Sequence, residues 1–323
     1  MKGESKTAAL VASLCCVALF SFNASAQDAE LKGRCAKRLA VNLLGQSPSA
    51  ALLALANPQD GVDAMMLPAG PVIQTDGGVS TAFPPATPFQ DRLARFVNSE
   101  FNAVPGLSNQ EDSSYFYARY VLQRDLPWSE VFVGNYQIDT NGNVTPGTGQ
   151  LGYFRVTAWM RRYAGNEIDG FRLPGAYRML QNTIGIQLKP VMNTTGATSG
   201  TRQTDAVCAS CHYDEVFGLD YAAKVLSRRV GTGTTMTFAA PPAGSQVFLG
   251  GQTISNDQQM MTAVINSVNF KFNTCRLAMK FAYGRSEFKC EGPAFDRCMT
   301  AFTASGKITD AIKSIVKDAS YCQ

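Results

Sequence analysis

Apolar residues recur at helical spacing along most of the chain, and stretches rich in glycine and proline separate these runs. In the segment AELKGRCAKRLAVNLLG (29–45), Leu31, Cys35, Leu39 and Leu43 follow one another at intervals of four residues. Other runs of the same period predict helices at 89–101, 114–126, 214–227, 256–268, 271–283, 293–304 and 308–321. The pattern therefore predicts a mostly α fold.

Polar stretches interrupt the helical runs. The sequence DTNG (139–142) is a turn signal and indicates a small hairpin, and residues 230–253 are expected to form a loop with a short hairpin. The segment MNTTGATSGTRQTDA (192–206) is polar and lacks periodicity. We therefore place a domain boundary there, and predict a helical domain of unknown role over 27–200 and a second domain over 201–323.

The first 26 residues have the pattern of a secretory signal peptide. Lys2 and Lys6 provide the basic start, and AALVASLCCVALF (8–20) provides the apolar stretch. The small residues ASA (24–26) form the cleavage site. The apolar stretch is shorter than the about 20 residues that a membrane span requires. The sequence predicts an exported bacterial protein, periplasmic or extracellular, without a membrane span in its mature form.

The charge of the mature chain excludes some classes of partner. Removal of Lys2, Lys6 and Glu4 leaves 27 basic and 24 acidic residues, a net charge of +3. No block of like charges occurs, so the sequence indicates neither nucleic acid nor an anionic membrane as a partner. The apolar content of 45% is sufficient for a large core.

The strongest chemical signal is the octet CASCHYDE (208–215), which contains the only histidine of the chain, His212. The spacing C-x-x-C-H is the attachment signature of c-type haem. Cys208 and Cys211 are one helical turn apart, so their thiols can form thioethers with the two vinyl groups of a porphyrin. His212 would then be the proximal ligand of the iron. We therefore predict one covalent haem c.

Two other interpretations of the same octet are weaker. A structural zinc site needs four ligands, commonly two cysteine pairs, and no second pair at ligand spacing lies beside a histidine. A redox Cys-x-x-Cys pair, closed as a disulfide, is typical of a βαβ context. The approach to this motif, TRQTDAV (201–207), is polar instead.

The ligand on the opposite side of the iron is harder to predict. A second histidine is not available, so methionine, lysine, asparagine, water or an open position remain. Met236 is the first candidate because it lies in the flexible loop GTGTTMTFAAPP, although it could also pack in the core on a small strand. Met260 or Met261 comes next, and Met192, in the loop upstream of the motif, comes last.

Four cysteines near the C-terminus are expected to form two disulfides, because exported chains retain them. Cys290 and Cys298 are eight residues apart on one predicted helix, hence about 12 Å, which exceeds the roughly 7 Å limit between bridged α-carbons. That pairing, together with Cys275–Cys322, is therefore disfavoured.

The geometry of two predicted helical hairpins distinguishes between the remaining disulfide pairings. A turn near residue 286 places Cys275 opposite Cys298, and a turn near residue 306 places Cys290 and Cys322 at equal distances from the turn. We therefore expect Cys275–Cys298 and Cys290–Cys322. The pairing Cys275–Cys290 with Cys298–Cys322 fits the hairpins less well, and four free thiols are the remaining alternative. Cys35 would be unpaired, either buried or available for a dimer.

The haem motif and its surroundings resemble a known family. The run CASCHYDEVFGLDYAAKVL, a Gly/Thr/Pro loop, FKFNTCRLAMKFAYGRSEF and a terminal helix pair are similar to the planctomycete-type c-type cytochrome proteins. Those are exported multi-module helical proteins with one CxxCH haem module and a closing module that carries a cysteine, an aromatic residue and Gly-Arg. The corresponding residues of this chain are Cys275, Tyr283, Gly284 and Arg285.

The resemblance extends upstream, where RCAKRLAVNLLGQSPSAALLALA resembles the leading helical module and RYVLQRDLPWSEVF a middle one. It implies an exported, mainly helical haem protein that acts in extracytoplasmic electron transfer. The chain is shorter than the larger members, whose extra substrate or adhesion domains it lacks.

These observations predict a helical N-terminal module, a cytochrome-c-like haem module and a C-terminal helical bundle stapled by disulfides. The leading hypothesis is a monohaem c-type cytochrome that carries single electrons between extracytoplasmic redox proteins. One alternative is a haem enzyme or sensor with an open distal site, peroxidase-like or gas-binding. Another is a partner-binding helical protein in which haem is mainly structural. The oligomeric state is not indicated.

Overall fold

A computed structural model describes residues 28–67, 86–106, 112–189, 196–214 and 217–323. The expected signal peptide and Met192 lie outside these ranges. Within them, no helix combines the length and apolar character that a membrane span requires.

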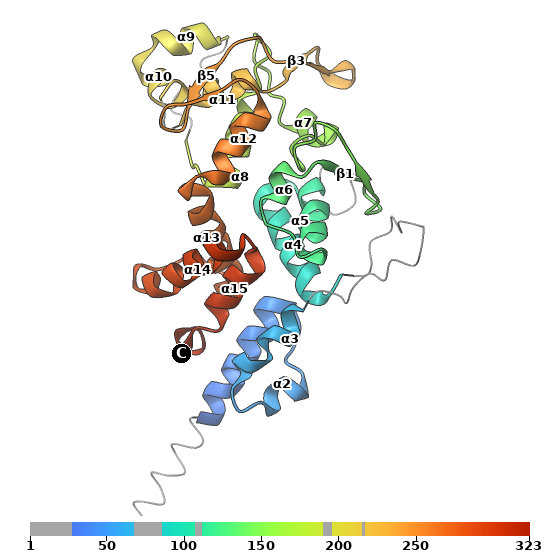
Figure 1. The fold of residues 1–323 in the computed structure, drawn as a ribbon, viewed down its shortest axis with the longest axis vertical. Coiled ribbons are helices and arrows are strands. Elements are labelled where there is room, and N and C mark those ends of the chain that lie inside the picture. The colour runs from blue at the N-terminus through green and yellow to red at the C-terminus, as the bar shows by residue number, and fades with distance from the viewer. Residues whose placement is uncertain (1–27, 68–85, 107–111, 190–195, 215–216) are drawn as a thin grey trace, which may run out of the picture.

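The described chain is mostly helical (Figure 1). After a helix over 28–39, the α-helices are α2 (Ala50–Ala54), α3 (Val62–Met66), α4 (Pro88–Phe101), α5 (Ser113–Gln123), α6 (Glu130–Val133), α7 (Thr157–Arg162), α8 (Leu173–Ile184), α9 (Ser199–Thr204), α10 (Ala206–His212), α11 (Leu219–Val225), α12 (Asp257–Asn266), α13 (Val268–Tyr283), α14 (Gly292–Ser305) and α15 (Ile308–Val316). Short 3-10 or π segments are η1 (Ala40–Leu44), η2 (Pro58–Gly61), η4 (Gly233–Thr235), η5 (Lys289–Glu291) and η6 (Ala319–Cys322).

The strands of the described ranges form antiparallel pairs. They are β1 (Tyr136–Ile138) with β2 (Val144–Pro146), β3 (Arg228–Val230) with β4 (Thr237–Ala239), and β5 (Gln246–Phe248) with β6 (Gln252–Ile254). The hairpin predicted at residues 139–142 is confirmed, because β1 and β2 flank it and Ile138 pairs with Val144. The Asp139 carboxylate stabilises this turn by accepting hydrogen bonds from the backbone N–H groups of Asn141 and Asn143.

Local sequence signals begin and end the long helices. Thr87 and Gln90 form a capping box at the start of α4, where each side chain bonds the other residue's backbone N–H. Gly284 ends α13 and Gly306 ends α14, with φ angles of 70° and 71°. This left-handed backbone favours glycine, so the break predicted at residue 306 is confirmed.

One continuous cluster of apolar side chains extends from the helix over 28–39 to α15. At its centre, the ring of Phe132 on α6 lies 5.8 Å from that of Phe101 on α4 and 5.6 Å from that of Phe270 on α13, between ring centroids. Burial of each such side chain contributes about 1.5–3 kcal/mol to folding. Residues from both predicted domains belong to this cluster. The regions before and after the boundary predicted near residue 200 therefore share one core.

The disulfides agree only partly with expectation. Cys275 of α13 pairs with Cys298 of α14, the expected pair, with α-carbons 5.9 Å apart. Cys322 pairs with Cys35, with α-carbons 4.8 Å apart. The predicted Cys290–Cys322 bridge is therefore wrong, Cys35 is not a free thiol, and Cys290 is an exposed thiol without a bridge.

The physical reason for the error is that α15 is shorter than predicted. It ends at Val316, and the Asp318 side chain caps η6 by accepting a hydrogen bond from the Ser320 backbone N–H. The chain therefore turns before it can run alongside α14 back to Cys290. Cys290 itself precedes α14, in η5.

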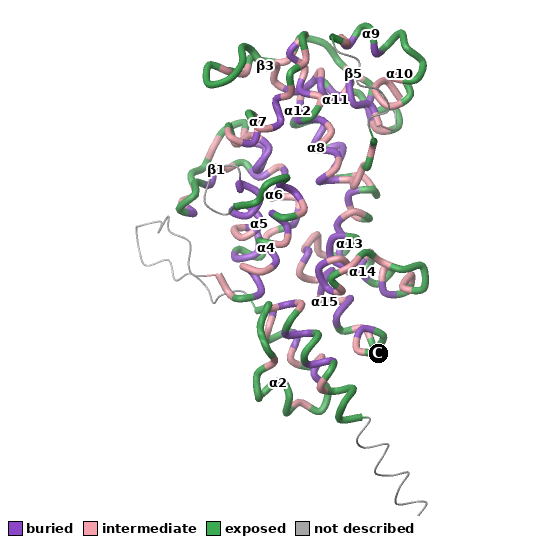
Figure 2. Tube along the Cα trace, turned by 180° about the vertical axis from the view of Figure 1, so that it is seen from behind, coloured by how far each residue is buried: buried purple, intermediate pink, exposed green. Residues whose placement is uncertain are grey.

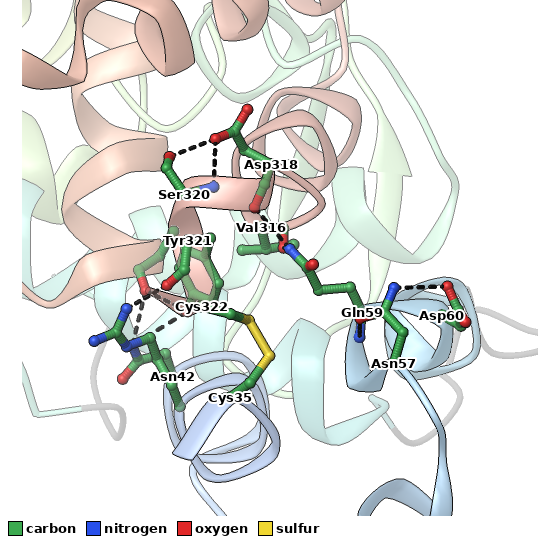
Figure 3. Close-up of a disulfide and its surroundings, with 12 residues drawn as sticks. Cys35, Asn42, Asn57, Gln59, Asp60, Val316, Asp318, Ser320, Tyr321 and Cys322 are labelled. Carbon is green, nitrogen blue, oxygen red and sulfur yellow. Dashed lines mark hydrogen bonds between the residues drawn. A yellow bond between two sulfur atoms is a disulfide. The ribbon is translucent and has the colours of Figure 1, made fainter. Parts of the chain in front are cut away.

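The Cys35–Cys322 bridge is surrounded by hydrogen bonds between the two ends of the described chain (Figure 3). Gln59 donates to the carbonyl oxygens of Val316 and Asp318 at 2.7 and 2.8 Å. At the end of the N-terminal helix, the side-chain amide of Asn42 donates to the carbonyl oxygen of Ala282 at 2.8 Å, and the hydroxyl of the fully buried Tyr321 donates to the same oxygen. The bridge and these bonds together hold the N-terminal helix against the C-terminal helices.

We expect Cys35→Ser to lower the free energy of unfolding by about 2–5 kcal/mol, because loss of the bridge frees two ends that are far apart in the unfolded chain. The matched control is Cys290→Ser, which removes an exposed, unbridged thiol and should change stability by less than about 0.5 kcal/mol. Denaturant unfolding under non-reducing conditions measures both. Equal effects, or a mapped peptide linking Cys290 to Cys322, would contradict this pairing.

Candidate haem-binding site

The CASCH motif forms the short helix α10 at the end of the molecule away from α2 and α3 (Figure 1). Asp205 caps this helix, and its carboxylate accepts hydrogen bonds from the backbone N–H groups of Val207 and Cys208, both at 2.9 Å. Cys208 and Cys211 are therefore one turn apart on one face. Both are free thiols and partly exposed.

His212, the last residue of α10, forms a hydrogen bond with a buried carboxylate. Its Nδ1 lies 2.7 Å from Oδ2 of Asp220, which is on α11 and is fully buried. The carboxylate is an acceptor, so Nδ1 carries the proton and donates it to Asp220. Nε2 of His212 has no hydrogen-bond partner among the described residues, and the side chain is 22% exposed. This nitrogen is available as a ligand.

Asp220 is itself held by several donors. Arg202 of α9 donates to both carboxylate oxygens, through Nε at 2.9 Å and Nη2 at 3.0 Å, and the Ser199 hydroxyl donates at 2.8 Å. Burial alone would raise the pKa of Asp220, but the bonds from His212, Arg202 and Ser199 outweigh it and lower the pKa to about 2. Asp220 is therefore ionised at neutral pH.

Arg202 connects this carboxylate to a second one. Its Nη1 donates to Glu167 at 2.8 Å, and its side chain is only 6% exposed. Burial would lower the pKa of the guanidinium, but the charges of Asp220 and Glu167 raise it above its ordinary value. The positive charge is thus shared between two carboxyl groups.

Tyr213 adds a further link between α9 and α11. Its hydroxyl donates to the carbonyl of Ser199 at 2.7 Å, and Nζ of Lys224 lies 3.3 Å from the same hydroxyl. The position of His212 therefore depends on contacts with α9 and α11, because no residue of α10 itself is buried (Figure 2).

Sequence reasoning missed the residues that hold His212. Arg202 and Ser199 lie in the polar segment 192–206, where no helix was predicted, yet they form α9. The apolar pattern could not reveal this helix because the side chains that it buries, Ser199 and Arg202, are polar. Asp220 did carry a signal, since it is an acidic residue in the otherwise apolar helix LDYAAKV.

The structure does not bring the β3–β4 hairpin, where the first candidate Met236 lies, to α10. Met236 is half-buried between η4 and β4, and the β3–β4 hairpin projects on the side of the molecule opposite to α10 (Figures 1 and 2). Met260 and Met261 are fully buried in α12. Ligation by Met236 would therefore require a placement of the β3–β4 hairpin that differs from the observed one.

The donor set of α10 fits a c-type haem. Two free, partly exposed thiols lie one turn apart, and the neighbouring imidazole has its Nδ1 anchored and its Nε2 available. Among the residues that the structure describes, no group of three or more His, Cys, Asp and Glu side chains could hold a metal ion by itself. A haem iron needs no such group, because the porphyrin provides four of its ligands.

Comparisons of the chain with models of protein families, with curated proteins and with solved structures found no match. The functional interpretation therefore depends on the residues of the site.

We expect Arg202→Ala to lower the free energy of unfolding by about 3–5 kcal/mol, because it leaves the buried Asp220 carboxylate without its main counter-charge. The matched control is Arg276→Ala. Its pair with Glu287 is at the surface, with the Arg276 side chain 61% exposed, and is worth about 0–1 kcal/mol. Urea unfolding compares the two variants. Similar losses of unfolding free energy in both variants would show that the buried pair stabilises the protein no more than the surface pair.

Proposed function

We propose that this chain is an exported monohaem c-type cytochrome that carries single electrons between extracytoplasmic redox proteins. The observation that carries the proposal is the arrangement of α10: Cys208 and Cys211 on one face, and His212 anchored through Nδ1 with Nε2 available. Membership in the planctomycete-type c-type cytochrome family is part of the same proposal, on the sequence resemblance alone.

Three residues of α10 and Asp220 of α11 have distinct roles in this function. The thiols of Cys208 and Cys211 would hold the haem covalently, and Nε2 of His212 would ligate the iron. Asp220 keeps the imidazole in the tautomer that ligation requires. The bound haem would supply an iron that accepts and releases one electron. Because α10 is at the surface, a redox partner can approach without rearrangement of the core.

Export supports this assignment. The described chain contains two disulfides, Cys35–Cys322 and Cys275–Cys298, and disulfides persist in the oxidising compartments outside the cytoplasm. Attachment of haem to a C-x-x-C-H motif occurs in the same compartments. The signal-peptide pattern at residues 1–26 supports export to such a compartment.

The first test is the mass of the denatured, purified protein. We expect the mature chain to weigh one haem more than its polypeptide, and the double variant Cys208→Ala/Cys211→Ala to lose this extra mass, because it has no thiol in the motif that could form a thioether. Cys290→Ser is the matched control and should retain it, since this thiol is also free but lies far along the chain. Haem that extracts into acid acetone from the wild type would refute covalent attachment.

A haem enzyme or sensor with an open distal site is the second candidate, and the position of the β3–β4 hairpin favours it. With Met236 on the side opposite to α10, this methionine does not complete an electron-transfer pair with His212 in the observed fold.

We expect Met236→Leu to leave the visible spectrum of the oxidised haem protein unchanged, because the observed hairpin does not approach α10. Met192→Leu, at a position outside the described residues, is the companion variant. Loss of a weak sulfur-to-iron absorption at the red end of the spectrum in Met236→Leu would contradict the expectation and assign Met236 as the sixth ligand. A high-spin spectrum of the wild type would favour the open-site candidate.

A further inference from the structure

We propose that Asp220 is a positioning residue that gives the His212 imidazole partial anionic character and thereby lowers the reduction potential of the iron that His212 holds. This inference rests on the proposed function, because it concerns the same axial ligand. It goes further, since it assigns the poise of the redox centre to a residue outside the CASCH motif.

The hydrogen bond between His212 and Asp220 has the features of a charge-assisted bond. The distance of 2.7 Å from Nδ1 to Oδ2 lies at the short end of the range for such bonds. Asp220 has no exposed surface, so water does not compete for the carboxylate. A carboxylate that accepts the Nδ1 proton raises the basicity of the ligating nitrogen.

The network around Asp220 keeps this carboxylate charged and fixed. Arg202 binds both of its oxygens and Ser199 binds one of them. Arg202 also binds Glu167, so its positive charge is not directed at Asp220 alone. The carboxylate therefore retains negative charge that it can share with the imidazole.

The sign of the effect follows from charge. The oxidised iron carries one more positive charge than the reduced iron, so a more basic, partly anionic ligand stabilises the oxidised state more. Hydrogen bonding to an axial ligand is one of the ways in which proteins set haem potentials. Asp220 should therefore shift the midpoint potential downward.

The test is a redox titration of the haem-loaded protein and three variants. Asp220→Asn retains the size of the side chain and an oxygen that can accept the Nδ1 proton, but removes the charge, so we expect a positive shift of the midpoint potential. The matched control is Asp257→Asn, which removes a carboxylate that is also buried and bidentately paired with an arginine, Arg155, but does not touch His212. It should leave the potential unchanged.

The variant Ser199→Ala tests whether the charge of Asp220, and not only its structural support of His212, sets the midpoint potential. It removes one donor from Asp220 and leaves the carboxylate more basic, so we expect a smaller shift of the opposite sign. This variant also keeps the inference testable if Asp220→Asn does not fold. A purely structural role for Asp220 would not produce shifts of opposite sign.

The outcomes distinguish this inference from the proposed function. Covalent haem with an unchanged potential in both Asp220→Asn and Ser199→Ala, or a shift in Asp257→Asn equal to that in Asp220→Asn, would overturn the role of Asp220 while the cytochrome assignment stands. A wild-type protein without covalent haem would instead refute the proposed function. Shifts of opposite sign with a silent control support the inference.

Discussion

The ionised carboxylate of Asp220 is fully buried, and the arrangement of the helices around the motif depends on it. A buried charge is costly unless charged and hydrogen-bonding partners surround it. Those partners come from different segments: Arg202 and Ser199 from α9, and His212 from α10. The need to satisfy one anion therefore fixes three short helices relative to one another. Neither α9 nor α10 buries an apolar side chain of its own, so apolar packing does not fix these two helices.

The rest of the molecule provides the frame to which this group of helices is attached. One apolar cluster runs through both halves of the chain, and the Cys35–Cys322 bridge closes it at the opposite end. The core side of the site is therefore rigidly supported, whereas the face of α10 that carries the thiols remains accessible. This division between a supported imidazole and an accessible face with two thiols is compatible with the proposed exchange of electrons with other proteins.

Features that depend on local sequence could be predicted, and features that depend on tertiary placement could not. Apolar spacing predicted the long helices, and the turn signal at 139–142 predicted the β1–β2 hairpin. The Cys275–Cys298 pair followed from the geometry of adjacent helices. The Cys35–Cys322 pair joins residues 287 positions apart, so no local pattern carried it. The apolar pattern did not predict α9, because this helix buries an arginine and a serine whose partners, Asp220 foremost, lie on other segments.

The central claim is that Cys208, Cys211 and His212 hold one covalent haem. The most direct test is the pyridine haemochrome spectrum of the purified mature protein, which reports the porphyrin's own substituents after the protein ligands have been displaced. The account predicts the spectrum of a haem whose two vinyl groups have both been converted to thioethers, at one haem per chain. The spectrum of a haem with intact vinyl groups, or no haem at all, would contradict it.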